Sequence, residues 1–521
     1  MSTAAAEKKE EEVKGGELLY CGTTAWDSIG RRKGLTESNL VSPTRLRPLV
    51  GVDICYVASG CASCHCVALD VDGRCYTWGR NDSRMTVCLQ KGQLGHGDQI
   101  QRDRPTVVSA LASYKIVKAG SGRSHTVVVT EDGLSLAFGW NKHGQLGTGS
   151  VKNEIELYPV RCLVSEVKDV ACGADFTVWL TSVEGASILT AGLPQYGQLG
   201  HGTDNEYNTK DSSVRLAYEA QPRPKAISSL AGQTIVKVAC GSNHTGGALE
   251  DMGGGLGHRE QKDEFSPRRL EVFTKHNIVP PGAVVSAGSV NCACTAGGGQ
   301  MYMWGKIKNS GDDWMYPKPL MDLSGWNIRC MDSGSMHHFV GADSSCISWG
   351  HAQSGELGYG PGGQKSSAIP KKVDMLEGMH VLSVACGFAH SLVVVDRTNV
   401  ADQLDQLDVY DGKPAGEGVE EPTTEPPPAK KPTKKSAAKT QSSNKRKKSK
   451  ESSDSEDSGE ASVDEDEDES DEEANGFAEK KSRRGGKASG RGRGRGRPPS
   501  AAKEAAAAAP AKRGRGRPKK A

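Results

Sequence analysis

Histidine recurs in this chain inside one short phrase, and histidine is the side chain most often used for proton transfer near neutral pH. The phrase reads V-A-C-G-S-N-H-T at Val238–Thr245 and V-A-C-G-F-A-H-S at Val384–Ser391. A catalytic histidine is expected once per active site, whereas this one returns with nearly every copy. We therefore predict that these histidines form hydrogen bonds between strands. They are His65, His125, His244, His337 and His390.

Cysteines gather beside the first of these histidines with a spacing that suits zinc. Because that histidine is already explained by the repeated phrase, we expect the cysteines to be core residues and the chain to hold no metal. Three further cysteines share one place in their copies, which indicates small buried residues near a common axis. The zinc-like group is Cys61, Cys64, His65 and Cys66, and the repeated set is Cys172, Cys240 and Cys386.

Motifs for covalent catalysis are missing from the sequence. No glycine-rich phosphate loop ends in Gly-Lys-Ser/Thr, and no nucleophile-elbow spacing stands out. We expect no catalytic residue and no cofactor.

Two arginine-rich motifs near the C-terminus are of a type that binds DNA. The runs R-G-R-G-R-G-R-P-P and K-R-G-R-G-R-P-K-K each contain R-G-R-P and resemble the AT-hook. Glycine suits the floor of a minor groove only about 6 Å wide, and flanking arginines reach the negative potential of narrow A·T tracts. The alternative is a solvated basic tail. The candidate DNA-binding residues are Arg495, Gly496, Arg497, Pro498, Arg515, Gly516, Arg517 and Pro518.

The rest of the tail consists of segregated charge blocks. Residues 430–450 hold ten bases and no acid, and 451–473 hold fourteen acids and no base. Such composition cannot bury a core, so we expect residues 398–521 to be disordered. The acidic block could fold back on the basic residues, and phosphorylation of its serines would strengthen that competition. The serines are Ser452, Ser453, Ser455 and Ser458, and the candidate nuclear import residues are Lys445, Arg446, Lys447 and Lys448.

The repeated phrase also organises residues 17–397. One glycine from each of seven copies recurs at intervals of 46 to 68 residues, which is typical of a propeller or array. Each phrase is followed by two alternating runs joined by a turn such as Asp-Gly, by a G-Q-L-G or G-E-L-G turn, and by a proline-bearing segment. Four strands per copy predict the blade of an all-β, seven-bladed propeller. The glycines are Gly60, Gly120, Gly173, Gly241, Gly288, Gly334 and Gly387.

The ends of this region predict how the ring closes. The last copy stops after V-V-V-D-R (Val393–Arg397), and E-L-L-Y-C-G at Glu17–Gly22 resembles its missing strand. We expect Glu17–Gly22 to pair into the blade that contains Val384–Val394, so that no sheet edge is left open.

Three copies depart from the pattern. The fourth is short, which predicts a missing or distorted strand between Leu249 and Gly257. The first carries an insertion between Asn81 and Gly92. The third has an excess within Thr203–Leu216 that must leave the blade as a protruding loop, and long loops on rigid scaffolds often bind partners. The candidate partner-binding residues there are Asp204, Asn205, Glu206 and Tyr207.

The phrase, the W-G strand ends and G-Q-L-G-H-G at Gly92 and Gly197 resemble the regulator of chromosome condensation family of seven-bladed propellers. Longer runs, such as C-G-T-T-A-W-D-S-I-G at Cys21–Gly30 and H-R-E-Q-K-D-E at His258–Glu264, look closer to its second vertebrate-type member than to its founder. The resemblance covers roughly residues 17–397 and does not extend to the tail.

The resemblance implies binding to a small GTPase and guanine-nucleotide exchange on it, a reaction that breaks no covalent bond. The alternative is a docking scaffold for chromatin and proteins without exchange activity. A plant photoreceptor relative uses clustered tryptophans, but Trp78, Trp304 and Trp349 end W-G strands and are expected in the core. The sequence G-W-N-K around Trp140 does not match the photoreceptor motif.

Charge and composition predict the domain boundaries, the cellular location and the partners of the protein. Residues 1–400 carry 39 bases and 40 acids, so the ring has no net attraction for phosphate, whereas 480–521 carry sixteen bases and one acid. No apolar run has secretory or membrane-spanning length. We expect a disordered N-terminus (1–16), a propeller (17–397) and a disordered tail (398–521). The protein is expected to be a soluble nuclear monomer that binds AT-rich DNA and no membrane.

Overall fold

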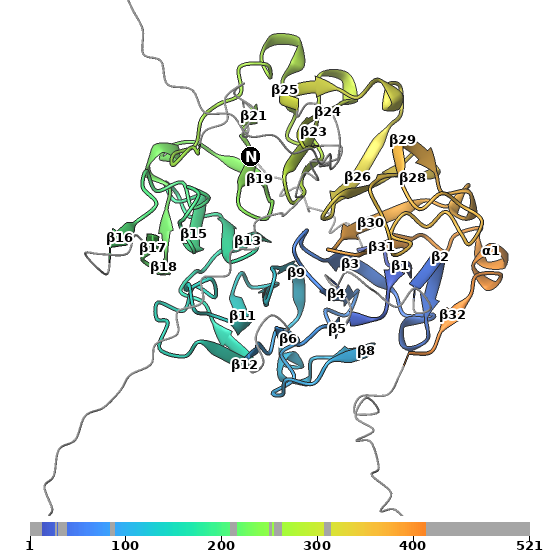
Figure 1. Ribbon diagram of the computed structural model, residues 1–521, viewed down its shortest axis with the longest axis horizontal. Coiled ribbons are helices and arrows are strands. Elements are labelled where there is room, and N and C mark those ends of the chain that lie inside the picture. The colour runs from blue at the N-terminus through green and yellow to red at the C-terminus, as the bar shows by residue number, and fades with distance from the viewer. Residues whose placement is uncertain are drawn as a thin grey trace, which may run out of the picture. The chain divides into compact units, whose positions relative to one another are not determined.

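The structure is a computed structural model that describes residues 13–26, 29, 39–83, 89–208, 216–249, 253–254, 263–306 and 314–412. These residues fall within one compact unit, Met1–Pro426. Short antiparallel sheets are arranged around a common centre, as Figure 1 shows, so the chain is an all-β propeller.

Six blades contain four or five strands each. Their middle strands are almost wholly buried, whereas the outer strands are mostly half-buried or exposed. In order from the centre outward, the first blade contains β3 (Ile54–Ala58), β4 (His65–Asp70), β5 (Cys75–Gly79) and β8 (Arg102–Val107), and the second contains β9 (Ile116–Ser121), β10 (His125–Thr130), β11 (Ser135–Trp140) and β12 (Ile155–Arg161). The blade of the third copy contains β13 (Val167–Cys172), β14 (Phe176–Thr181), β15 (Ile188–Gly192) and β18 (Gln221–Ala226), and that of the fifth contains β22 (Val285–Ala287), β23 (Asn291–Ala296), β24 (Gln300–Gly305) and β25 (Trp314–Pro319). The blade of the sixth copy contains β26 (Ile328–Ser333), β27 (His337–Ala342), β28 (Ser345–Gly350) and β29 (Ser367–Lys372), and the closing blade contains β30 (Val381–Cys386), β31 (His390–Val395), β1 (Glu17–Thr23), β2 (Asn39–Leu46) and β32 (Val409–Tyr410).

Helical structure is confined to short turns and one helix among the described residues. Most of the turns follow an outer strand and lead the chain back to the centre. They are η3 (Arg47–Leu49), η4 (Ser109–Leu111), η5 (Ser228–Leu230), η6 (Lys275–Asn277), η7 (Gly297–Gly299), η8 (Met321–Leu323) and η9 (Asp374–Leu376), and the helix is α1 (Ala401–Asp405). No helix in these parts of the chain is long and apolar enough to cross a bilayer.

The expected count of seven complete blades is not confirmed, because six blades of four or more strands are found in the described residues. The fourth copy forms a three-stranded sheet of β19 (Ile235–Cys240), β20 (Thr245–Leu249) and the two-residue strand β21 (Gly253–Gly254). The predicted missing or distorted strand between Leu249 and Gly257 falls mostly on residues that the structure does not describe, and it stays a prediction. Residues 250–252 and 255–262 lie outside the described residues.

The two ends of the propeller meet in one blade, as the sequence predicted. Strand β1 pairs antiparallel with β31, with Glu17 opposite Val395 and Gly22 opposite His390. All seven residues of β1 are buried. The N-terminal segment is therefore a middle strand of the closing blade (β30–β31–β1–β2–β32), between β31 and β2.

The described chain continues beyond residue 397, where the sequence placed the end of the propeller. Strand β32 adds to β2 in parallel, with Arg45 opposite Val409. The Arg45 guanidinium donates to Asp405 Oδ1 at 3.0 Å, and Arg104 Nε of the first blade donates to the carbonyl of Asp411 at 2.6 Å. Residues 401–412 thus form a strap that ties the outer edge of the closing blade to its neighbour.

Glycine is required at the glycine position of the repeat because its backbone lies against the ring of the histidine of the same copy. A Cβ on Gly241 would lie 2.0 Å from His244 Cε1, and one on Gly387 would lie 2.2 Å from His390 Cε1. In the second copy the residue in this position is Gly122, whose N–H donates to the carbonyl of His125 at 2.9 Å. The sequence alignment had placed Gly120 there, so that assignment is wrong by two residues.

Candidate functional site

The repeat histidines join neighbouring blades, which confirms a structural role and adds the identity of their partners. His125 Nε2 lies 2.9 Å from Thr177 Oγ1, His337 Nε2 lies 3.0 Å from Ser391 Oγ, and each hydroxyl belongs to the next blade. At the closure, His390 Nε2 lies 2.9 Å from Ser59 Oγ. These bonds link successive blades into the ring.

Burial keeps these imidazoles neutral. Desolvation lowers the pKa of His65 and His390 to about 3 and that of His125, His244 and His337 to about 4. His65, His125, His337 and His390 are also at most 1% exposed, so their imidazoles are enclosed by the ring of blades and are suited to a structural role.

The predicted core residues are also confirmed. Cys172, Cys240 and Cys386 are 6, 8 and 0% exposed, and the three W-G tryptophans are at most 5% exposed. Cys61, Cys64 and Cys66 are buried and not joined in disulfides, and His65 binds hydroxyls instead. Within the described ranges no three His, Cys, Asp or Glu side chains are grouped to hold a metal ion.

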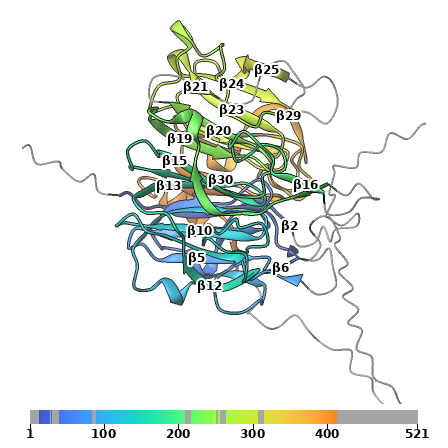
Figure 2. The ribbon, with the colours of Figure 1, turned by 90° about the vertical axis from the view of Figure 1, so that its left-hand side faces the viewer.

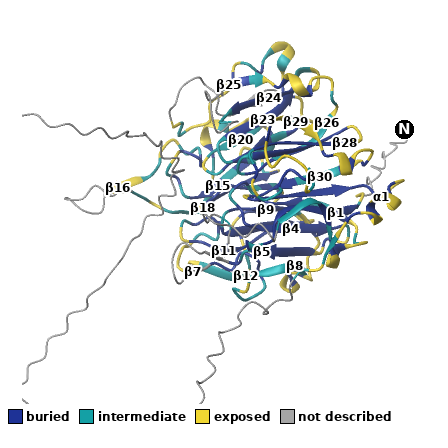
Figure 3. Ribbon diagram, turned by 45° about the vertical axis from the view of Figure 1, so that its right-hand side comes forward, coloured by how far each residue is buried: buried dark blue, intermediate teal, exposed yellow. Residues whose placement is uncertain are grey.

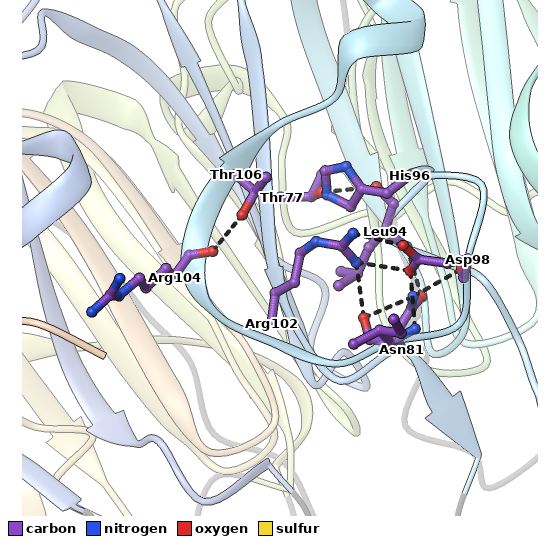
Figure 4. Close-up of polar contacts among 9 residues, drawn as sticks. Thr77, Asn81, Leu94, His96, Asp98, Arg102, Arg104 and Thr106 are labelled. Carbon is purple, nitrogen blue, oxygen red and sulfur yellow. Dashed lines mark hydrogen bonds and ion pairs between the residues drawn. The ribbon is translucent and has the colours of Figure 1, made fainter. Parts of the chain in front are cut away.

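The G-x-L-G turns form a second set of links between blades. Figure 4 shows the first of them, where Thr77 Oγ1 donates to the carbonyl of Leu94 at 2.7 Å and Asn81 Nδ2 donates to that of Asp98 at 3.1 Å. The Arg102 guanidinium pairs with Asp98 at 2.8 Å and fixes the far side of the loop. The loop in turn binds the next blade, because Gly97 N donates to the carbonyl of Leu157 at 3.0 Å.

The long connections of the first and third copies leave the ring on one face, which is the candidate functional site. Because strands alternate in direction, the links from first to second strand and from third to fourth strand of a blade emerge on the same side. We call it the loop face. It holds the insertion of the first blade, with its small hairpin of β6 (Asp82–Ser83) and β7 (Leu89–Gln90), and the predicted loop of the third copy.

The predicted loop of the third copy is a separate two-stranded sheet. Strand β16 (Glu206–Asn208) pairs with β17 (Leu216–Tyr218), and Figures 2 and 3 show β16 standing out from the ring. Residues 209–215 lie outside the described residues. Asp204, Asn205, Glu206 and Tyr207 are therefore on a projecting β16–β17 hairpin, and Tyr207 is 48% exposed.

Acidic and aromatic side chains surround this hairpin. Partial burial, followed by the charges of Glu206 and Asp204, raises the pKa of the Tyr218 hydroxyl, which places both carboxylates near that ring. Tyr196, from the adjoining loop, also acts on Tyr218 and is 40% exposed. The hairpin thus presents negative charge beside exposed rings.

A second cluster on the loop face was not predicted. Asp175 is 6% exposed, and its Oδ2 pairs with Arg123 Nη2 at 3.1 Å. The other oxygen, Oδ1, is buried without a hydrogen-bond partner in the described chain. An unsatisfied buried carboxylate oxygen is costly, so an ordered water or a donor from a bound partner would stabilise it. The only signal in the sequence is that the third copy has an acidic residue, Asp175, directly before the position of the repeat histidine, where the other copies have none.

Charged groups from three blades meet around this aspartate. Lys91 lies over the Trp140 ring at 3.5 Å from its centroid, and the His143 ring contacts the same tryptophan at 5.2 Å. Desolvation lowers the pKa of the His143 imidazole. The negative charge of Asp175 opposes this shift, and the positive charges of Lys142, Arg123 and Lys91 add to it. The loop face therefore combines a fixed acid–base cluster with a projecting acidic hairpin.

The remaining predicted residues fall outside the described residues. These are the candidate DNA-binding residues of 495–498 and 515–518 and the candidate import residues 445–448.

Comparison with known proteins identifies the family. The model of the "Regulator of chromosome condensation (RCC1) repeat" matches residues 72–129, 132–180, 187–247 and 343–394. Protein RCC2 of Mus musculus is 35% identical over 433 residues, covering 76% of this chain and 80% of the relative.

Two solved structures support the fold. Human WBSCR16 superposes with a TM-score of 0.57 at 21% identity, over 74% of this chain and 99% of that one. Prp20p of Saccharomyces cerevisiae gives 0.57 at 17% identity, over 75% and 94%. The chain therefore belongs to the regulator of chromosome condensation (RCC1) family.

Proposed function

We propose that this protein is a nuclear, chromatin-associated propeller that binds a small GTPase through its loop face and promotes release of the bound nucleotide. The observation that carries the proposal is the buried, half-satisfied Asp175 on the face that also projects the β16–β17 hairpin. Family membership supports it, since the solved structure of yeast Prp20p was described with its binding to Gsp1p and histones.

The charge of the hairpin suits nucleotide exchange. Asp204 and Glu206 bring negative charge on a projecting element, and such charge placed near a bound nucleotide repels its phosphates and competes for their magnesium ion. Exchange requires no bond to be made or broken, which agrees with the absence of a catalytic constellation in the described ranges. The non-exchanging docking scaffold remains the alternative outcome of the test.

Binding to nucleotide-free GTPases tests the first half of this proposal. We expect Asp175→Asn, or Asp204→Asn with Glu206→Gln, to weaken binding of the full-length protein to its GTPase at least tenfold. The substitutions remove charge at nearly constant volume. Binding is measured by biolayer interferometry against a panel of immobilised GTPases.

The matched control is Asp72→Asn, because Asp72 is an exposed aspartate in the β4–β5 turn on the opposite face. Equal weakening by Asp72→Asn and Asp175→Asn would contradict the assignment of the loop face. If the wild type binds no GTPase, the GTPase proposal falls.

The ring and the tail have separate roles in this proposal. The three-stranded sheet stands as a reduced seventh blade, since β19 contacts β13 on one side and β22 on the other. Beyond the strap, from about residue 413, the tail acts as an arm that carries the nuclear import residues and both AT-hook motifs. Tail and ring would then hold chromatin and GTPase at the same time.

DNA binding by the tail has its own test. We expect full-length protein to prefer A·T-rich over G·C-rich duplexes, with affinity that falls steeply as salt rises. Replacing Arg495 and Arg497 by alanine should cost about 1–3 kcal/mol per groove contact and reduce the preference. Fluorescence anisotropy on both duplexes at two salt concentrations measures this.

The control for that experiment replaces Arg483 and Arg484, which are basic but lie outside both motifs. This change should weaken binding to both duplexes equally. Equal affinity of the wild type for the two duplexes would show that the motifs act only as basic charge.

A further inference from the structure

The histidine link between neighbouring blades is interrupted at two places. Phe176 takes the histidine position in the third copy and Asn291 takes it in the fifth, each opposite the glycine that ends the next strand. Between these two interruptions one link is kept, because His244 Nε2 lies 3.1 Å from Cys292 Sγ. Copies four and five are therefore joined to each other by a histidine, whereas neither is joined by one to its outer neighbour. We call the described residues of these two copies, within 235–319, the sector.

The seam between the third copy and the sector lacks the link because the side chain is a hydrocarbon ring. A Cβ on Gly173 would lie 1.8 Å from Phe176 Cε1, so this ring fills the place that the histidine ring takes in other copies. The hydroxyl that would receive the link is present, since Thr245 Oγ1 donates to the carbonyl of Gln198 at 2.9 Å. Phenylalanine offers this hydroxyl no second hydrogen bond.

The seam between the sector and the sixth copy lacks the link because the side chain is too short. Asn291 is 2% exposed, and its Oδ1 has no hydrogen-bond partner in the described chain. Across the seam His338 is fully buried, and its Nε2 has no partner in these residues either. Both atoms gain partners when water enters the seam, so opening costs less here than at a linked seam.

The apolar core is divided at the same seams. In the part of the chain that the structure describes, it forms clusters that each lie between two neighbouring copies. One cluster packs Phe176 against Ile235 of β19, and another packs Met303 of the fifth copy with Val340 of the sixth. One seam can therefore separate while the packing at the others is kept.

Contacts of the inner strands hold both seams closed near the axis of the ring. Ala174 N donates to the carbonyl of Ser242 at 2.9 Å, and Ser286 Oγ donates to Ser333 Oγ at 2.9 Å. The histidine links lie one strand farther from the axis, on the second strand of each blade. The two seams are thus closed at the centre and weakened farther out.

We propose that the sector opens from the ring as one unit, at a lower free energy than global unfolding. Folded proteins open locally in contiguous units, and regions with weaker contacts open first. The other four junctions of the ring keep their histidine links, so the borders of the opening unit fall at the third and sixth copies.

Opening of the sector would act on the β16–β17 hairpin. Gly202, at the base of the hairpin, donates its N–H to the carbonyl of Phe265 in the fourth copy at 2.7 Å. A Cβ on Gly197 would lie 2.4 Å from the carbonyl oxygen of Glu264, so the same loop packs closely on the sector. If the hairpin binds a partner, as in the function proposed above on which this consequence rests, the partner and the closed sector stabilise each other.

Hydrogen exchange of the full-length protein, followed by mass spectrometry without any partner, tests the opening itself. In the wild type we expect the amides of β19, β20, β23 and β24 to share one opening free energy. They should exchange at least tenfold faster than the amides of β10 and β31, which lie in linked blades. The measurement involves no GTPase, so its outcome is independent of the proposed function.

Restoring a link at either seam gives the decisive variants. Phe176→His places an imidazole where it can bond Thr245, and it should slow exchange at least tenfold throughout the sector, including β24 on the far side. Asn291→His combined with His338→Thr copies the histidine–threonine pair of the second and third blades, and it should slow β19 in the same way. Slowing across the whole sector is the mark of a single opening unit.

The controls change the same positions without making a link. Phe176→Leu and His338→Thr alone should leave exchange in the sector as fast as in the wild type, or faster. Exchange of the sector that is no faster than that of β10 would overturn the proposal. So would slowing confined to the strand next to each substitution.

Removal of the link inside the sector keeps the test decisive if the restored variants do not fold. Cys292→Ala deletes the thiol that His244 contacts, and it should divide the sector, so that β19 and β20 exchange at a different rate from β23 and β24. A single shared rate in this variant would contradict the role given to the histidine links.

Discussion

Deletion of residues 1–25 is expected to prevent the ring from folding. This change removes β1 from the middle of the closing blade and exposes the edges of both β31 and β2. Leu18, Leu19, Tyr20 and Cys21 are at most 1% exposed, and burial of such side chains contributes about 1.5–3 kcal/mol each. The sum is comparable with the net stability of a typical domain, about 5–15 kcal/mol.

Deletion of residues 1–12 is the control for this prediction. It keeps Lys14, which pairs with Asp396, and Glu17, whose carboxylate accepts from Arg397 Nε at 2.8 Å. Thermal unfolding followed by circular dichroism should be unchanged by this shorter deletion. A melting curve of the 26–521 protein that matches the wild type would show that β1 is not needed for closure.

Mild acid is expected to destabilise the propeller cooperatively. Desolvation holds the pKa of His338 at about 3, as it does for the repeat histidines, which makes six buried imidazoles with pKa values of about 3 or 4. In the unfolded chain a histidine has a pKa of about 6.5, so the unfolded state takes up protons first as pH falls. Stability is complete above pH 6.5 and is lost towards pH 4, by about 1.4 kcal/mol per histidine per pH unit.

Three carboxyls oppose this trend, because burial raises the pKa of Asp169 and of Glu356 as well as that of Asp332. Burial raises the pKa of Asp332 to about 7, although Cys386 N donates to it at 2.7 Å, so protonation of this group favours the folded state as pH falls. Six histidines outnumber these three carboxyls, so the net effect is acid lability. The melting temperature should fall steeply between pH 7 and pH 5.

Replacing exposed His276 by glutamine is the control for the acid experiment, and it should leave this dependence unaltered. His125→Gln should lower the melting temperature at pH 7, since it loses the link to Thr177, and should make the dependence on pH shallower. A melting temperature that is constant from pH 7 to pH 5 would contradict the assignment of neutral buried histidines.

The repeat pattern predicted most of the fold because each copy is a local unit. Spacing alone located most of the strands and the closure by Glu17–Gly22. The repeat pattern failed where packing decides which residue takes a given position in the repeat. K-A-G-S-G offers two glycines, and only the contact with the His125 ring selects Gly122 over Gly120.

The contacts of the strap with distant segments were beyond the sequence pattern. The strap enters the closing blade through a two-residue parallel strand held by Arg45 and Arg104, about 300 or more residues away in the chain, and such a short run has no periodicity to detect. The site was predicted in part. Excess length identified the β16–β17 hairpin, but the unsatisfied oxygen of Asp175 follows from its burial beside Arg123.

Release of labelled GDP from a panel of small GTPases tests the central claim most directly. Each GTPase is loaded with fluorescent GDP and mixed with full-length wild type, Asp175→Asn or Asp72→Asn in the presence of excess GTP. The account predicts that wild type and Asp72→Asn accelerate release from at least one GTPase, whereas Asp175→Asn does so at least tenfold less. Binding without acceleration by the wild type would contradict exchange activity and leave the docking scaffold, and acceleration that Asp175→Asn retains in full would contradict the proposed site.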